Sequence, residues 1–126
     1  MQYLLLIYQA ELPAGAQPDP DEMAAEFAAY DVFTRETRDR SQFIAGEALE
    51  PTSTATSVRV QDGRTIVTDG PFAETKEALG GFYLLECKDL DEAIEMAAKI
   101  PASKRGTIEV RPIWAYTTGA SVTGEG

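Results

Sequence analysis

The hydrophobic and polar positions along the chain fall into a few distinct patterns. The opening QYLLLIYQ is apolar at consecutive positions, which is typical of a central strand covered on both faces and uncommon in a helix this short. Further strands are predicted at residues 42–49, 81–88 and 106–114. In the last of these, Ile108 and Val110 are expected on one face, and Glu109 and Arg111 on the other.

Two helices are predicted between these strands. Asp19 and Asp89 are each followed three residues later by a glutamate, which is a capping-box pattern, and Pro20 suits the first helical position. Residues that can face a core then recur at helical spacing, at Met23, Phe27, Tyr30 and Thr34 in the first segment and at Leu90, Ala93, Ile94 and Ala97 in the second. The sequence therefore predicts amphipathic helices, one ending near Asp39 and the other stopped near Pro101.

A two-stranded hairpin is predicted between residues 58 and 68. Val58 and Val60 alternate with Arg59, and Asp62-Gly63 supplies a two-residue turn that tolerates positive φ. The order is thus strand, helix, strand, hairpin, strand, helix, strand, which is the split β-α-β arrangement of ferredoxin-like α+β folds with an inserted hairpin. Because two helices of this size cover only one face of the sheet, we expect a homodimer through the other sheet faces.

The length, composition and net charge of the chain limit the classes of protein to which it can belong. With 126 residues the chain has the size of one domain, predicted at residues 1–116, and a Gly-, Ser- and Thr-rich tail at 117–126 is expected to be flexible. The formal net charge of −10 argues against nucleic acid and anionic membrane as partners, because binding to phosphates depends on Lys and Arg. The single cysteine, Cys87, is expected to be a small core residue, and the opening apolar run is too short for a signal or membrane segment. A cytoplasmic protein is expected.

The chain contains no histidine. This removes the side chain that most often performs general acid–base chemistry at neutral pH, and also the commonest zinc ligand. Any chemistry must therefore use carboxylates, lysine, tyrosine or backbone groups, and we expect no cofactor.

The segment DGPFAETKEALGG, residues 69–81, is the strongest candidate site. Gly70 precedes proline and Pro71 fixes φ, so this bend holds Asp69 and Phe72 in set directions at the end of the sheet. Two interpretations of Asp69 stay open. In one, its carboxylate accepts backbone N–H bonds within the turn and is chemically inert. In the other, it lies at the edge of an apolar cleft, partly desolvated by Phe72, and acts as a general base.

Other polar residues near this segment are secondary candidates. Glu74, Lys76 and Glu77 are predicted on a short turn of helix ended by Gly80 and Gly81, with Lys76 in an ion pair or, in an enzyme, stabilising developing negative charge. The acids match no recognisable metal loop, so we expect no metal site. The predicted ligand-binding residues are Tyr8, Glu47, Arg59, Gly70, Pro71, Phe72 and Glu74.

The stretches MQYLLLIY, TIVTDGPFAETKEALGGFYLLE, DLDEAIEMAAKIP and EVRPI resemble the YCII-related family, and specifically its branch named for the DGPF motif. The resemblance covers nearly the whole chain except the tail, and it implies a dimeric ferredoxin-like α/β barrel. Members of the wider family resemble muconolactone-isomerase-type barrels. One branch is linked to dehydrochlorination of a lactone, in which a His-Asp pair is proposed to act. This sequence has an aspartate in the motif, Asp69, but no histidine to complete the pair.

The resemblance leaves three hypotheses for function. In the first, a small and mainly apolar organic molecule binds in a cleft beside the DGPF loop, with Asp69 as candidate base for isomerase- or lyase-type chemistry and Lys76 or Arg59 as charge stabiliser. In the second, the protein is a regulatory or accessory module, because DGPF-branch proteins are often encoded beside extracytoplasmic-function sigma factors and an acidic surface suits a basic partner. In the third, the DGPF loop is architecture only. We rank small-molecule binding first and leave open whether the protein is an enzyme.

Overall fold

The computed structural model describes residues 1–13 and 15–115, so the tail predicted at 117–126 lies outside the described residues. The elements follow the predicted order of strand, helix, strand, hairpin, strand, helix and strand. Their bounds are β1 Gln2–Gln9, α1 Pro20–Asp39, β2 Phe43–Ala48, β3 Thr56–Gln61, β4 Arg64–Asp69, β5 Ala78–Glu86, α2 Leu90–Lys99 and β6 Thr107–Pro112, with short 3-10 helices η1 Thr52–Thr54 and η2 Pro101–Lys104. The predicted α+β class is confirmed.

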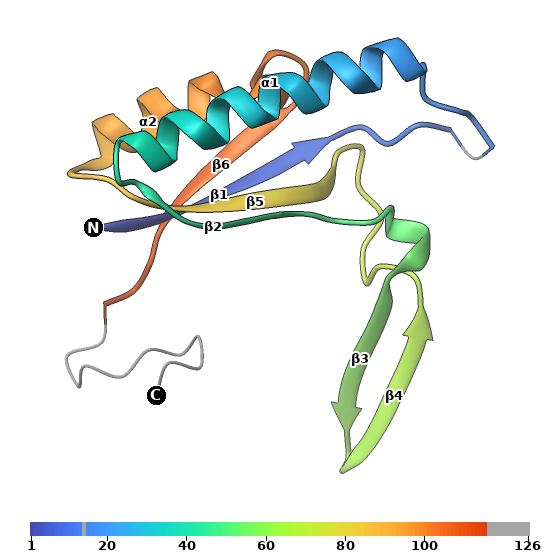
Figure 1. Cartoon of the computed structure of the whole chain (residues 1–126). Helices are drawn as coiled ribbons and strands as arrows, with labels where there is room; N and C mark the ends of the chain where they lie inside the picture. Colours follow the sequence, from blue (N-terminus) through green and yellow to red (C-terminus); the bar gives the residue numbers. More distant parts are fainter. Residues whose placement is uncertain (14, 116–126) are drawn as a thin grey trace.

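Four strands form the main sheet in the order β2-β5-β1-β6, and every neighbouring pair is antiparallel. This is the strand order of the split β-α-β arrangement, with the β3–β4 hairpin as a separate two-stranded sheet. Both helices lie on one face of the main sheet, and the hairpin points away from them (Figure 1). The opposite sheet face is therefore covered by neither of the two described α-helices.

The core lies between the helices and the face of the sheet that they cover. In β1 the side chains of Tyr3, Leu5 and Ile7 are buried, whereas the residues between them are partly exposed. Tyr83 of β5 extends the same face and packs edge-on against Phe33 of α1, with ring centroids 4.9 Å apart. The continuous apolar run of β1 is thus half inside the core and half on the uncovered face.

The predicted buried stripe of α1 is wrong over its first half. Met23 is 37% exposed and Phe27 is 66% exposed, whereas Phe33 and Thr37 are buried. Figure 1 shows a reason, because the N-terminal end of α1 extends past the end of β1, where no strand of the main sheet lies beneath it. A helical apolar pattern becomes a buried face only where another element covers it.

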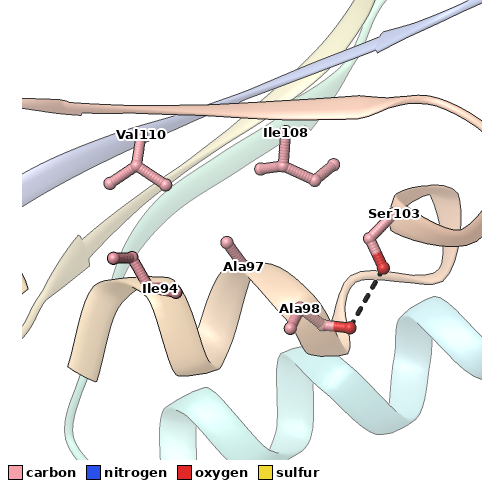
Figure 2. Close-up of a pocket in the computed structure, with 6 residues that line it drawn as sticks. All are labelled: Ile94, Ala97, Ala98, Ser103, Ile108 and Val110. Atoms are coloured by element: carbon pink, nitrogen blue, oxygen red, sulfur yellow. Dashed lines mark hydrogen bonds between the residues drawn. The ribbon is translucent and has the colours of Figure 1, made fainter. Parts of the chain in front are cut away.

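The buried stripe of α2 is also displaced from its predicted position. Ala93 and Ala97 are buried as expected, but Met96 replaces Leu90 and Ile94, which are 48% and 51% exposed. The helix lies near the edge strand β6, so residues on its outer side reach the margin of the sheet rather than its centre (Figure 2). The small alanines allow the helix to approach the strands closely.

Both predicted helix starts are confirmed by their caps. Asp19 Oδ1 accepts a hydrogen bond from the backbone N–H of Asp21 at 3.3 Å, and Asp89 Oδ1 accepts one from Glu92 at 2.9 Å. Glu92 in turn accepts the N–H of Lys88 at 2.9 Å, one residue before the cap. These bonds satisfy backbone donors that have no partner within the helix.

An ion-pair cluster joins the two helices. The carboxylate of Glu36 on α1 contacts Lys99 Nζ of α2 at 2.6 Å and the guanidinium of Arg40 at 2.9 Å. The hydrogen bond from Lys99, reinforced by both positive charges, lowers the pKa of Glu36 below its usual value. The cluster joins the C-terminal part of α1 to the C-terminal end of α2.

Candidate functional site

The DGPF segment begins at the base of the hairpin, where two hydrogen bonds hold it. The backbone N–H of Gly70 donates to the carbonyl of Ala55 at 2.7 Å, and the Ser57 hydroxyl donates to the carbonyl of Gly70 at 2.8 Å. Gly70 has φ +94°, a left-handed backbone conformation that favours glycine. The predicted bend is therefore present, and glycine is needed there for its backbone freedom.

The predicted helical turn over residues 74–81 is wrong, because strand β5 begins at Ala78 and contains both Gly80 and Gly81. A Cβ on Gly81 would lie 2.9 Å from the carbonyl oxygen of Glu47, so glycine there lets β2 approach β5. Gly80 falls where the β1–β5 register shifts, between the pairs formed by Ile7 and Tyr8. The two glycines thus serve strand pairing and not a helix end.

Asp69 is the last residue of β4 and is exposed. Within the part of the chain that the structure describes, its carboxylate accepts no hydrogen bond, so the turn-acceptor arrangement is not formed there. Phe72 is 84% exposed and does not shield it from water in the single chain. Neither predicted environment of Asp69 is present in one isolated chain.

The hairpin register separates Asp69 from Arg59. Residues directly opposite each other in an antiparallel pair share a face, and faces alternate along each strand. Asp69 pairs with Thr56, which places it on one face with three valines, Val58, Val60 and Val67. Arg59 pairs with Ile66 on the other face, which also carries Arg64. The two predicted site residues therefore point in opposite directions.

Lys76 and Glu74 lie in the loop between β4 and β5, and both are exposed. Lys76 makes no ion pair with either neighbouring acid in the described chain, contrary to the expected pairing. Glu77 instead accepts a hydrogen bond from the hydroxyl of Thr107 at 2.9 Å. This bond joins the end of the loop to the start of β6.

The uncovered face of the main sheet, called the open face below, brings together residues that are distant in sequence. One row across its four strands contains Glu47, Phe82, Leu6 and Glu109, and the next contains Ala45, Leu84, Leu4 and Arg111. The predicted residues Tyr8 and Glu47 both lie on this face, with their Cα atoms about 12 Å apart from strand and residue spacings. The open face is apolar at its centre and polar at its margins.

Sequence reasoning missed one polar pair on the open face. The guanidinium of Arg111 contacts the carboxylate of Glu109 through Nε at 3.0 Å and also through Nη2. This hydrogen bonding raises the pKa of Arg111, with a smaller contribution from the nearby Tyr8. The alternation in TIEVRP placed both side chains on one face, but only the pairing of β6 with β1 shows that they lie beside Leu4 and Leu6.

An apolar groove lies between α2 and β6 (Figure 2). It is open, has a volume of about 250 Å³ and is lined by Ile94, Ala97, Ala98, Ser103, Ile108 and Val110. The Ser103 hydroxyl already donates to the carbonyl of Ala98 at 3.0 Å. The groove therefore presents an apolar lining and few polar groups to a ligand. It contains none of the predicted site residues.

Two further groups limit the possible chemistry. Cys87 is buried as predicted, and burial, with the nearby carboxylates of Glu92 and Glu86, raises its pKa to about 11. A thiol with so high a pKa is a poor nucleophile at neutral pH. Across residues 1–13 and 15–115, no three acidic or cysteine side chains gather closely enough to hold a metal ion.

Comparison with known proteins places the chain in a family. The model of the YCII-related domain matches residues 1–117. The chain belongs to the YCII-related family. A relative from Rhizobium meliloti (strain 1021), named only as an uncharacterized protein, is 49% identical over 73 residues, which cover 56% of this chain and 59% of the relative. The aligned region therefore spans less than two thirds of that relative.

The YCII-related domain includes every predicted site residue, since all of them lie between residues 8 and 76. The match confirms the family resemblance, while the DGPF branch remains a prediction. Among the helices that the structure describes, none is long and apolar enough to span a membrane.

Proposed function

We propose that this YCII-related protein binds a small, mainly apolar organic molecule at the open face, beside the DGPF loop, in a space closed by a second copy of the chain. The supporting observation is the open face itself. Its centre consists of Leu4, Leu6, Phe82 and Leu84, each only partly covered in the single chain. Apolar sites with a few polar groups at the margin are typical of small-molecule binding.

The polar groups at the margin define what such a molecule would meet. Tyr8 offers a hydroxyl, Glu47 offers a carboxylate, and Arg111 offers donors beyond those occupied by Glu109. A ligand with an apolar body and one carbonyl or carboxylate group fits this distribution. Arg111 is therefore the expected contact for the ligand oxygen.

Catalysis is a second part of the proposal, with Asp69 as the base. Its carboxylate would take a proton from a carbon of the bound molecule, and a positive group would stabilise the resulting negative charge. In an isomerase the proton returns at another carbon, and in a lyase a leaving group departs instead. Of the positive groups, Arg111 lies on the open face, whereas Arg59 points away from Asp69 across the hairpin.

The test is a two-dimensional amide NMR titration with a panel of small lactones and aromatic carboxylic acids. Binding should shift resonances of β1 and β5, and Leu6→Glu should abolish those shifts, because it places a charge in the apolar centre. Ile94→Glu introduces the same charge in the α2–β6 groove and should leave them unchanged. Shifts confined to Ile94, Ile108 and Val110, or no shifts with any compound, would contradict the proposal.

Asp69→Asn separates binding from catalysis with any compound that binds. Loss of a chemical conversion with retained binding would support Asp69 as the base. Retained conversion would remove that role. If no panel member binds but a purified extracytoplasmic-function sigma factor shifts the same resonances, the accessory-module hypothesis replaces small-molecule binding.

A further inference from the structure

The β3–β4 hairpin has an apolar surface that the described part of its own chain leaves exposed. Val58, Val60 and Val67 share one face and are 60%, 71% and 61% exposed. Among the strands that the structure describes, β3 and β4 pair only with each other, and the hairpin points away from the helices (Figure 1). A two-stranded hairpin alone is marginally stable in water, so a valine face of this kind needs another surface to cover it.

We propose that residues 56–69 form an arm that packs this valine face against a second copy of the chain, so that each copy completes the other's site at Asp69. The proposal rests on the dimer contained in the proposed function and adds to it a defined interface. The two open faces alone would form a plain contact between sheets. The arms would add a second contact at the ends of this sheet interface, in which each copy's arm packs against the other copy.

The size of the open face favours this additional contact. Four strands spaced about 4.8 Å apart and about 20 Å long have a footprint of about 400 Å². A stable interface buries about 800 Å² on each partner. The hairpin face, with two strands of the same length, adds a footprint of about 200 Å². In a symmetric dimer the arm is contributed twice, once by each copy.

The distribution of charge favours a second copy of the chain as the partner that covers the valine face. The chain carries a formal net charge of −10, so two copies repel each other over most of their surfaces. Residues 56–69 contain two arginines, Arg59 and Arg64, and two aspartates, Asp62 and Asp69, and so carry no net charge. The centre of the open face is apolar. An acidic chain can associate with itself most favourably through these two regions.

The hairpin register then determines what happens to Asp69. It lies at the base of the arm, on the same face as the three valines. A surface that covers the valines therefore lies next to the Asp69 carboxylate and is supplied by the partner. Arg59 and Arg64, on the other face, stay in water, where their charges keep the outer side of the arm soluble.

The experiment compares the dimer dissociation constants of four proteins by sedimentation equilibrium. They are the wild type, Leu6→Lys on the open face, Val67→Lys on the valine face and Ile66→Lys on the opposite hairpin face. Val67→Lys should weaken association by at least about 30-fold, as expected for a buried interface contact. The adjacent control Ile66→Lys, with the same added charge, should change it less than about 3-fold. Leu6→Lys should produce monomers.

A second readout reports on Asp69 directly. Because Cys87 is buried and has a pKa of about 11, a thiol introduced by Asp69→Cys is the one that reacts with an alkylating reagent in the folded protein. Its alkylation should be at least about 10-fold slower in the dimer than in the monomeric Leu6→Lys background, since reactivity depends on access. Hydrogen exchange of residues 56–69 should slow in the dimer alone.

The outcomes distinguish the arm from the dimer. A wild type that stays monomeric at all concentrations overturns both. A dimer that Leu6→Lys dissociates, but in which Val67→Lys behaves like Ile66→Lys, overturns only the arm. Slow hydrogen exchange of the hairpin in monomeric Leu6→Lys would also overturn it, because the valine face would then be covered by its own chain.

Discussion

The helix-covered sheet and the β3–β4 hairpin are built from similar alternating strands, yet they differ completely in burial. In β1 and in the second half of β5 every second residue is buried, and Leu5 and Leu85 are fully buried. In β4 every residue is exposed, and in β3 only Ser57 is partly covered. The comparison shows that alternation defines two faces of a strand, while a covering layer decides whether either face becomes a core.

The largest difference between the two regions is expected in the free energy of unfolding lost when an apolar side chain is shortened to alanine. Leu85→Ala should lower the free energy of unfolding by about 2–5 kcal/mol, because it leaves a cavity in a packed core. Val67→Ala in the hairpin should change it by no more than about 0.5 kcal/mol at dilutions where the chain is monomeric. Urea denaturation of both variants measures this contrast. An equal loss in the two variants would mean that the hairpin is part of the core.

A smaller difference in the free energy of unfolding is expected between alanine variants of one glycine in each region. A Cβ on Gly106 would lie 2.2 Å from the carbonyl oxygen of Tyr8, so Gly106→Ala requires backbone movement and should cost about 1–3 kcal/mol. Gly63 has φ +75° and no atom near its Cβ position, so Gly63→Ala should cost about 1 kcal/mol through the left-handed backbone alone.

These two variants should also differ in which part of the chain they destabilise. Gly106→Ala should lower the melting temperature of the whole chain. Gly63→Ala should speed hydrogen exchange only within residues 56–69. If Gly63→Ala lowered the melting temperature as much as Gly106→Ala, the two regions would unfold as one unit.

The smallest expected effect concerns pH and the ion pairs of the helices. Because the pKa of Glu36 is lowered in the folded chain, its stabilising contribution is present above the unfolded value of about 4.5 and is lost as pH falls through the lower folded value. The pair is partly exposed, so the contribution should be below about 1 kcal/mol.

Thermal denaturation between pH 3 and 7 tests this with Glu36→Gln. That variant should lose stability near neutral pH and show a shallower decline in acid than the wild type. Glu74→Gln is the matched control, because Glu74 is exposed and makes no ion pair among the residues that the structure describes. Equal pH curves for Glu36→Gln and the wild type would contradict the assignment.

The sequence was sufficient to predict which segment forms the bend of the candidate site. It was not sufficient to predict which side chains lie close together there. The bend at Gly70 followed from a glycine before proline, and it is present. The convergence expected of Asp69 and Arg59 does not occur, because register within the hairpin places them on opposite faces. The Glu109–Arg111 pair was visible only as two residues on one side of a strand, without its neighbours on β1.

The sequence by itself determined the order of the main helices and strands and both helix starts, because these depend on local properties: period, capping groups and residues that tolerate special backbone angles. The tertiary structure decided which part of each apolar pattern is buried, as Phe27, Ile94 and the hairpin valines show. It also decided that Gly81 lies beside the backbone of Glu47. Burial and close approach depend on elements distant in the chain, and one-dimensional periodicity carries no information about which of them will meet.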